Sequence, residues 1–213
     1  MTLQLYFAPG ACSFVPHVAL ETVKAASGQD FEPKLVKLHK GEQQTPEYLA
    51  MNPNGQVPVL VVDGRPLTQI VAICDWLDRA FPQAGLLPAD SASRAQAMSR
   101  LAWMNNTVHP TFTHIFRPEK FADSDAGKAE IRRVASVQFR DYLERIQAWL
   151  ADGGALPVVL DAYAFVFLRW GGIAGIDPAS LPTYKVHVER LMQAPAVAAA
   201  LEREHIRLDT YKA

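Results

Sequence analysis

Strand-like patterns are confined to the first third of this chain, and almost everything after it has the spacing of helices. Apolar residues at helical spacing predict helices over 13–26 and 70–81. Short apolar runs and a hairpin turn at Asp63-Gly64 predict four strands, at Leu3–Phe7, Phe31–Leu38, Val59–Val62 and Arg65–Thr68. The order β-α-β followed by β-β-α is typical of a small four-stranded mixed sheet with helices packed on it.

A proline-rich stretch over residues 82–92 predicts a linker. Beyond it, apolar spacing predicts helices over 93–117, 125–151, 158–171, 182–193 and 196–205. Ser124-Asp125 is expected to cap the second of these helices and Gly153-Gly154 to end it. We therefore expect an α+β domain over 1–81 and an all-α domain over 93–213.

Composition excludes several classes of function. The 213 residues carry a net charge of −1 with no basic stripe, which does not favour nucleic acid as a partner. No apolar run is long enough to predict a transmembrane helix. No Lys or Arg precedes Cys12, so we expect no secretory signal and a cytoplasmic location. The two cysteines make neither a disulfide framework nor a zinc site, and no metal or tightly bound cofactor is expected.

Cys12 stands where the first predicted strand passes into the first predicted helix. A helix N-terminus carries partial positive charge and unpaired N–H groups, both of which favour thiolate over thiol. The position therefore predicts a reactive sulfur, and the alternative is a buried cysteine acting as a small hydrophobe. Ser13-Phe14-Val15 follows, so there is no C-x-x-C pair and any disulfide chemistry is monothiol.

The peptide bond between Val57 and Pro58 lies at the start of a predicted strand. A cis bond there would present the N–H and C=O of Val57 to an extended peptide ligand, as in strand addition. The alternative is a trans proline at a sheet edge, and the residues alone leave the choice open.

Four blocks of sequence resemble the bacterial (beta-class) glutathione transferases, in the order and spacing of that family. The resemblance covers essentially the whole chain. The blocks are Tyr6-Phe7-Ala8-Pro9-Gly10-Ala11-Cys12-Ser13-Phe14-Val15-Pro16-His17, Asn52-Pro53-Asn54-Gly55-Gln56-Val57-Pro58, His109-Pro110-Thr111-Phe112-Thr113-His114-Ile115-Phe116-Arg117-Pro118, and Asp161-Ala162-Tyr163 with Leu168-Arg169-Trp170.

The resemblance implies a thioredoxin-like first domain, a helical second domain and a two-fold homodimer. Cys12 would face the sulfur of glutathione, either stabilising its thiolate or forming a mixed disulfide with it. His109 would lie near that sulfur, donating a hydrogen bond or relaying a proton. Its alternative is an ordinary surface or core histidine.

Further residues would hold the rest of the tripeptide, according to the same resemblance. Val57, before a cis Pro58 and next to Gln56, would hold the cysteinyl backbone. Lys40 aligns approximately with a cation that pairs with a ligand carboxylate, and its alternative is a solvated surface lysine.

The chain departs from the family pattern at Gln69-Ile70. The family typically has an acidic residue followed by a small or hydroxyl residue, which bind the γ-glutamyl ammonium and carboxylate. Gln69 supplies no charge and Ile70 no hydroxyl, although the N–H groups that open the helix remain. The missing charge-assisted bond is worth about 1–3 kcal/mol, which predicts glutathione binding weaker by about ten- to hundred-fold.

Four aromatic residues are candidates for an apolar wall beside the reacting sulfur: Phe14, Phe112, Phe116 and Trp170. Ordinary core packing is the alternative for each. The leading hypothesis is a glutathione transferase that conjugates glutathione to a small hydrophobic electrophile. The rival hypotheses are a glutathione-dependent monothiol disulfide reductase or peroxidase, and a non-catalytic binding protein on the same scaffold.

Overall fold

A computed structural model describes residues 1–151 and 156–207. Its sheet has the strand order β2-β1-β3-β4, with bounds β1 Leu3–Phe7, β2 Glu32–Leu35, β3 Val59–Val62 and β4 Arg65–Thr68. Strand β1 pairs parallel with β2 and antiparallel with β3, and β3 forms a hairpin with β4. The predicted mixed sheet is confirmed.

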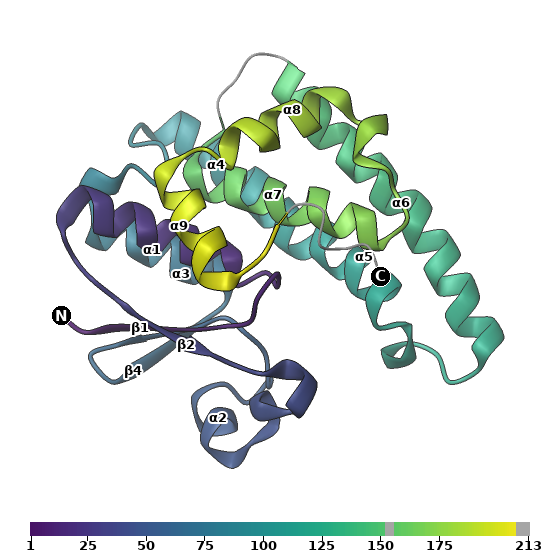
Figure 1. Cartoon of the computed structure of the whole chain (residues 1–213), viewed down its shortest axis with the longest axis horizontal. Helices are drawn as coiled ribbons and strands as arrows, with labels where there is room; N and C mark the ends of the chain where they lie inside the picture. The colour runs from purple at the N-terminus through teal and green to yellow at the C-terminus, as the bar shows by residue number, and fades with distance from the viewer. Residues whose placement is uncertain (152–155, 208–213) are drawn as a thin grey trace.

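Helices cover both faces of this sheet (Figure 1). Helices α1 (Phe14–Ser27) and α3 (Ile70–Ala80) pack on one face, where Leu60 joins the main hydrophobic core. The short helix α2 (Pro46–Met51) belongs to a smaller cluster on the other face, which contains Val59 and Val61. The alternation of side chains along β3 thus supplies both cores, and the first domain is thioredoxin-like.

The segment between β2 and β3 contains structure that the periodicity did not predict. Strand β2 is shorter than expected, and it is followed by two 3-10 turns, η1 (Leu38–Lys40) and η2 (Glu42–Gln44), and by α2. Thr45 caps α2 by accepting a hydrogen bond from the Tyr48 N–H at 3.3 Å, with proline next in the chain. Helix α2 has six residues, which is too short to show a helical repeat.

The second half of the described chain is helical, as predicted. Ser124 caps α6, because its Oγ accepts a hydrogen bond from the Gly127 N–H at 3.1 Å. The predicted end at Gly153-Gly154 lies outside the described residues. The elements are η3 (Pro82–Ala84), α4 (Ser91–Trp103), η4 (Met104–Val108), α5 (His109–Phe116), η5 (Pro118–Lys120), α6 (Asp125–Ala151), α7 (Val158–Ile173), η6 (Pro178–Ser180), α8 (Pro182–Leu191) and α9 (Pro195–Glu204).

Element η4 interrupts what the sequence predicts as one helix over 93–117. It is a π-helical turn in which the His109 N–H bonds the Met104 carbonyl, five residues back. A π turn inserts one extra residue into an otherwise α-helical path, and such turns are frequent at functional sites. This turn sets the direction in which α5 leaves α4.

Helix α7 runs through the centre of the helical domain and is buried along nearly its whole length. It packs against α1, and α9 returns to cover α1 as well, so the chain's last described helix lies on the first domain (Figure 1). One core therefore includes residues of both halves, and it also contains Leu86 and Leu87 from the segment between α3 and α4. No described helix is long and apolar enough to cross a membrane.

Candidate active site

The turn from Ala8 to Ser13 holds Cys12, the first candidate residue of the site. Ser13 Oγ accepts a hydrogen bond from the Ala8 N–H at 3.1 Å and donates one to the Ala8 carbonyl at 3.2 Å. The Ala11 N–H also bonds the Ala8 carbonyl, at 3.1 Å. These contacts close the turn at the start of α1 and fix the position of Cys12.

Cys12 is only 9% exposed, and its Sγ donates a hydrogen bond to the Val57 carbonyl at 3.6 Å. Burial raises the pKa of its thiol from 9.0 to about 12, with a smaller contribution from the charge of Glu204. Two backbone N–H groups at the helix start lower the pKa, but desolvation outweighs them. Burial therefore opposes the thiolate that the position of Cys12 predicts, and it favours the thiol form in the free protein.

The Val57-Pro58 peptide bond is cis, as the family resemblance implied. Gln56 is exposed, and its carbonyl accepts hydrogen bonds from Tyr48 Oη at 2.8 Å and Asn52 Nδ2 at 2.7 Å. These two bonds hold the backbone on the N-terminal side of Val57. The Val57 carbonyl therefore lies in a fixed place opposite the Cys12 sulfur.

Gln69 opens α3 with a positive φ of 73°, an uncommon conformation for a residue with a side chain. Its side chain is exposed, whereas Ile70 is buried in the main core. The Ile70 side chain is thus placed for packing, and only its backbone is available for a ligand. Lys40 is exposed on η1.

His109 begins α5, and the helical domain holds it on two sides. Its Nδ1 lies 2.9 Å from the hydroxyl oxygen of Tyr163, and its ring packs on Trp170 with the centroids 5.1 Å apart. Trp170 Nε1 donates to the Gly10 carbonyl at 3.0 Å, two residues before Cys12. Burial lowers the pKa of His109 to about 4, so the imidazole is neutral at neutral pH.

Three of the four predicted wall residues form one aromatic stack. The ring of Phe112 lies 4.3 Å from Trp170 and 5.7 Å from Phe116, with interplanar angles of 14° and 12°. The stack runs outward, because Trp170 is 5% exposed and Phe116 is 57% exposed. Phe14 is different: it is 0% exposed and packs on Phe165 in the core. The prediction that Phe14 lines an open wall is corrected to core packing.

Gly10 anchors the turn before Cys12 to the helical domain, which the sequence analysis did not foresee. Its N–H donates to Glu204 Oε2 at 2.9 Å, and its carbonyl accepts from Trp170 and, at 3.3 Å, from Arg169. At φ +69° a residue with a side chain would be strained, and its Cβ would lie 2.6 Å from Arg169 Nη1, so the guanidinium would have to move. Glu204 also bonds His17 Nδ1 at 2.8 Å.

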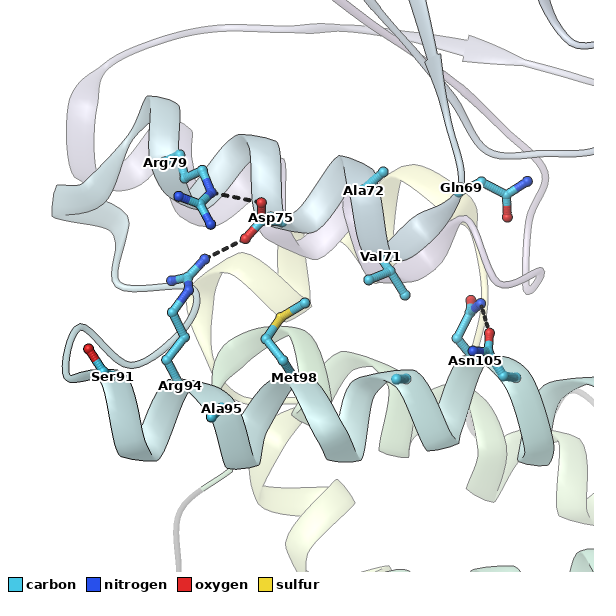
Figure 2. A pocket seen from close by; sticks show the side chains of 12 residues that line it. Gln69, Val71, Ala72, Asp75, Arg79, Ser91, Arg94, Ala95, Met98 and Asn105 are labelled. Atoms are coloured by element: carbon cyan, nitrogen blue, oxygen red, sulfur yellow. Dashed lines mark hydrogen bonds and ion pairs between the residues drawn. The ribbon is translucent and has the colours of Figure 1, made fainter.

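A cavity of about 730 Å³ lies between α3 and α4 (Figure 2), and Cys12 is not among the residues that line it. Gln69 stands at one end, and Asn105, from η4, stands near it across the cavity. At the other end Arg94 binds Asp75 and Asp78, each at 2.5 Å, and so joins the two helices. Among the described residues no group of three or more His, Cys, Asp or Glu side chains is placed to hold a metal ion.

A thioredoxin-like domain, a cysteine facing the residue before a cis-proline and a helical domain packed over that turn define a two-domain protein with a thioredoxin-like cysteine site. Residues 1–79 match the family model described as the N-terminal domain of glutathione S-transferase. A glutathione S-transferase of Xanthomonas campestris pv. campestris, GST-4.5, is 34% identical over 95% of this chain and 98% of its own length. GstA of Escherichia coli O157:H7 is 31% identical over 96% of this chain and 100% of its own length. The chain therefore belongs to the glutathione S-transferase family.

Solved structures agree with this assignment. A sphingomonad glutathione S-transferase complexed with glutathione has a TM-score of 0.81 and 33% identity over 96% of this chain and 100% of that one. The bacterial beta-class glutathione S-transferase of Sphingomonas chungbukensis has a TM-score of 0.80 and 32% identity over 94% of this chain and 98% of that one. The resemblance inferred from the four sequence blocks is confirmed.

Proposed function

We propose that this protein is a glutathione transferase that binds glutathione in front of Val57 and conjugates its sulfur to a hydrophobic electrophile. The observation that carries the proposal is the 3.6 Å contact between the Cys12 sulfur and the Val57 carbonyl. An extended cysteinyl backbone pairing with Val57 brings its own side chain to the same place as the Cys12 side chain. Relatives solved with glutathione bound support this choice of ligand.

Cys12 acts in this proposal as a hydrogen-bond donor and not as the nucleophile. In the free protein its S–H group is directed at the Val57 carbonyl. When the cysteinyl N–H of glutathione bonds that carbonyl, the S–H group turns to the ligand's sulfur and stabilises it as a thiolate. The raised pKa of Cys12 keeps the proton on the protein's sulfur, so that the charge develops on the ligand's sulfur.

The electrophile is proposed to bind along the stack of Trp170, Phe112 and Phe116, which leads from the buried side of His109 to an exposed ring. Apolar burial there holds the second substrate beside the sulfur, and orientation of the two reactants supplies much of the rate. Glutathione serves as co-substrate. The cytoplasm, where thiols stay reduced, suits such a reaction.

We further propose that a second copy of the chain covers the face between α3 and α4. This face carries the cavity in Figure 2, with apolar side chains of Val71 and Met98 beside the ion pairs of Arg94. A mixed apolar and charged surface of this kind suits a specific protein interface. The resulting homodimer is the assembly that the family resemblance implies.

Isothermal titration calorimetry with glutathione tests the proposed ligand, and the variant Cys12→Ser tests the role of the sulfur. We expect binding at millimolar glutathione or below. We also expect the serine variant to keep conjugation of a chlorinated aromatic electrophile within about tenfold, because a hydroxyl still donates a hydrogen bond to the thiolate. Absence of heat at millimolar ligand would end the proposal. Loss of all conjugation in a folded variant that still binds glutathione would show that a hydroxyl cannot replace the Cys12 thiol, and it would overturn the donor role proposed for residue 12.

Restoring a charge at residue 69 is expected to strengthen glutathione binding. The variant Gln69→Glu places a carboxylate at the opening of α3, where a charge-assisted bond to the ligand's ammonium is worth about 1–3 kcal/mol, or about ten- to hundred-fold in Kd. Calorimetry on this variant and on Gln96→Glu, which adds the same charge on an exposed position of α4, separates the local effect from net charge. Equal affinities for both variants would show that the γ-glutamyl group binds elsewhere.

A further inference from the structure

The hydroxyl group of Tyr163 contacts two side chains and has only one proton to give. Its oxygen lies 2.9 Å from His109 Nδ1 and 3.2 Å from Asn105 Oδ1. The Asn105 amide is oriented, because its Nδ2 donates to Asn106 Oδ1 at 2.9 Å. The oxygen of that amide therefore faces Tyr163, and an amide oxygen only accepts. The tyrosine proton must go to Asn105, which leaves His109 Nδ1 as the donor to the tyrosine oxygen.

From this chain of donors and acceptors we infer that Asn105 and Tyr163 hold neutral His109 in the tautomer protonated at Nδ1, so that Nε2 accepts the proton of the glutathione thiol. The inference rests on the proposed function for the identity of that thiol. It makes His109 the proton acceptor of the site and makes Tyr163 and Asn105 positioning residues.

The surroundings of the histidine support this assignment. Tyr163 is 0% exposed, so the Nδ1 edge of His109 faces the interior. His109 itself is half-buried, and within the described part of the chain Nε2 has no hydrogen-bond partner. Burial raises the pKa of Tyr163 well above its usual value, so its hydroxyl remains protonated.

The backbone explains why these groups meet. Asn105 lies in the π-helical turn η4 and His109 follows directly after it. Residues four apart lie on nearly the same face of a helix, so the side chains of Asn105 and His109 both reach one hydroxyl on α7. A regular α-helix through this point would change the direction of Asn105 relative to His109.

The proton balance of the step is simple. The S–H bond of glutathione breaks with its electron pair staying on sulfur, and the proton forms an N–H bond at His109 Nε2. The resulting imidazolium keeps its Nδ1–H bond to Tyr163, and Cys12 donates to the new thiolate. After the sulfur has reacted, Nε2–H returns its proton to water. The negative charge of the new thiolate beside Nε2 raises the pKa of the imidazole from its low value in the free protein. A positioned general base whose pKa lies near the operating pH contributes about a hundredfold or more to a reaction rate.

Removal of the Asn105 acceptor tests the tautomer directly. In Asn105→Ala the tyrosine proton is free to turn to His109 Nδ1, and the imidazole proton is expected to move to Nε2. Long-range ¹H–¹⁵N spectra of protein labelled in its six histidines distinguish the two tautomers, with the His109 signals assigned from a His109→Asn variant. Asn105→Asp keeps an acceptor oxygen and is expected to keep the original tautomer.

The kinetic consequence is measured on the same variants. We expect kcat for conjugation to fall by about tenfold or more in Asn105→Ala and in Tyr163→Phe, with glutathione Kd unchanged by calorimetry. Asn105→Asp is expected to stay within about threefold of the parent, as is Gln96→Ala, a control that removes an exposed amide from α4.

Each outcome has one meaning for the inference. An unchanged tautomer in Asn105→Ala overturns it, and so does a changed tautomer with unchanged kcat. The spectra are recorded without glutathione, so they decide the tautomer even if the parent protein fails to bind that ligand. Such a failure would contradict the proposed function and remove the assigned thiol from the inference, while the spectra report separately on the hydrogen-bond chain.

Discussion

Iodoacetamide is expected to alkylate Cys12 in the folded protein at neutral pH at least about a hundred times more slowly than in the unfolded chain. Burial raises the pKa of this thiol to about 12, so little thiolate exists at neutral pH. The greater nucleophilicity of a more basic sulfur offsets only part of that loss. Peptide mass spectrometry after timed alkylation measures the rate, and chain unfolded in urea is the reference.

The raised pKa of Cys12 also predicts how the rate of its alkylation depends on pH. Alkylation of Cys12 should rise about tenfold per pH unit from pH 7 to 10 without a plateau, because the thiolate fraction is still far from saturation. A plateau near neutral pH would show a low thiol pKa and would favour the reductase hypothesis. The same raised pKa makes the stability of the folded protein depend on pH. Because the pKa of Cys12 in the folded protein lies above the usual 9.0, Cys12 contributes to the free energy of unfolding below about pH 9, and this contribution is lost as the pH rises toward 12.

The variant Glu204→Ala is expected to lower the free energy of unfolding by about 3–5 kcal/mol. Both Glu204 and His17 have fully buried side chains, 2.8 Å apart, and the other carboxylate oxygen accepts the Gly10 N–H. Within residues 1–151 and 156–207 His17 Nε2 has no hydrogen-bond partner, so loss of the acid leaves the whole imidazole and the Gly10 N–H unsatisfied. Removal of one partner from a buried pair costs more than the pair contributes.

Urea unfolding measures this loss, and two further variants make the result specific. Glu202→Ala removes an exposed acid from the same helix and should change the free energy of unfolding by less than about 0.5 kcal/mol. Glu204→Gln keeps one acceptor oxygen of the two, so an intermediate loss of about 1–3 kcal/mol is expected. Equal stabilities for Glu204→Ala and Glu202→Ala would show that the buried acid does not hold the two halves together.

Helices with a long apolar repeat and local capping residues could be predicted from the sequence. Helix α6 has the predicted bounds, and Ser124 caps it as expected. Elements that depend on a few residues could not be predicted in this way. Helix α2 is too short for a repeat, and the π turn η4 is invisible because the apolar spacing continues through it.

In the candidate site, too, local sequence motifs could be recognised, whereas contacts with distant residues could not. Cys12, Val57 and His109 could be identified because short motifs mark them, and the structure brings Cys12 and Val57 into contact. The thiol pKa could not be predicted, because it depends on burial by segments far away in the chain. The partners of His109 and His17 lie 54 and 187 residues away in sequence, respectively, and no local pattern indicates them.

At the start of α7, an acid that could cap the helix is instead bound by a residue from another helix. Asp161 lies near the start of this helix, where an acid ordinarily bonds free backbone N–H groups. Its carboxylate instead accepts a hydrogen bond from His187 Nε2 on α8 at 2.7 Å, and among the residues that the structure describes no side chain caps the helix at Pro157. The fold of the helical domain therefore uses this acid to join two helices.

The bonds of Gly10 have a consequence for how this protein can be recombined. Both polar groups of one residue in the first domain are satisfied by side chains from the second, namely Glu204 on one side and Trp170 with Arg169 on the other. A chimera that joined residues 1–80 to the helices of another relative would need a carboxylate, an indole and a guanidinium in matching places. The unit that can be exchanged between relatives is therefore the set of both halves, chosen together.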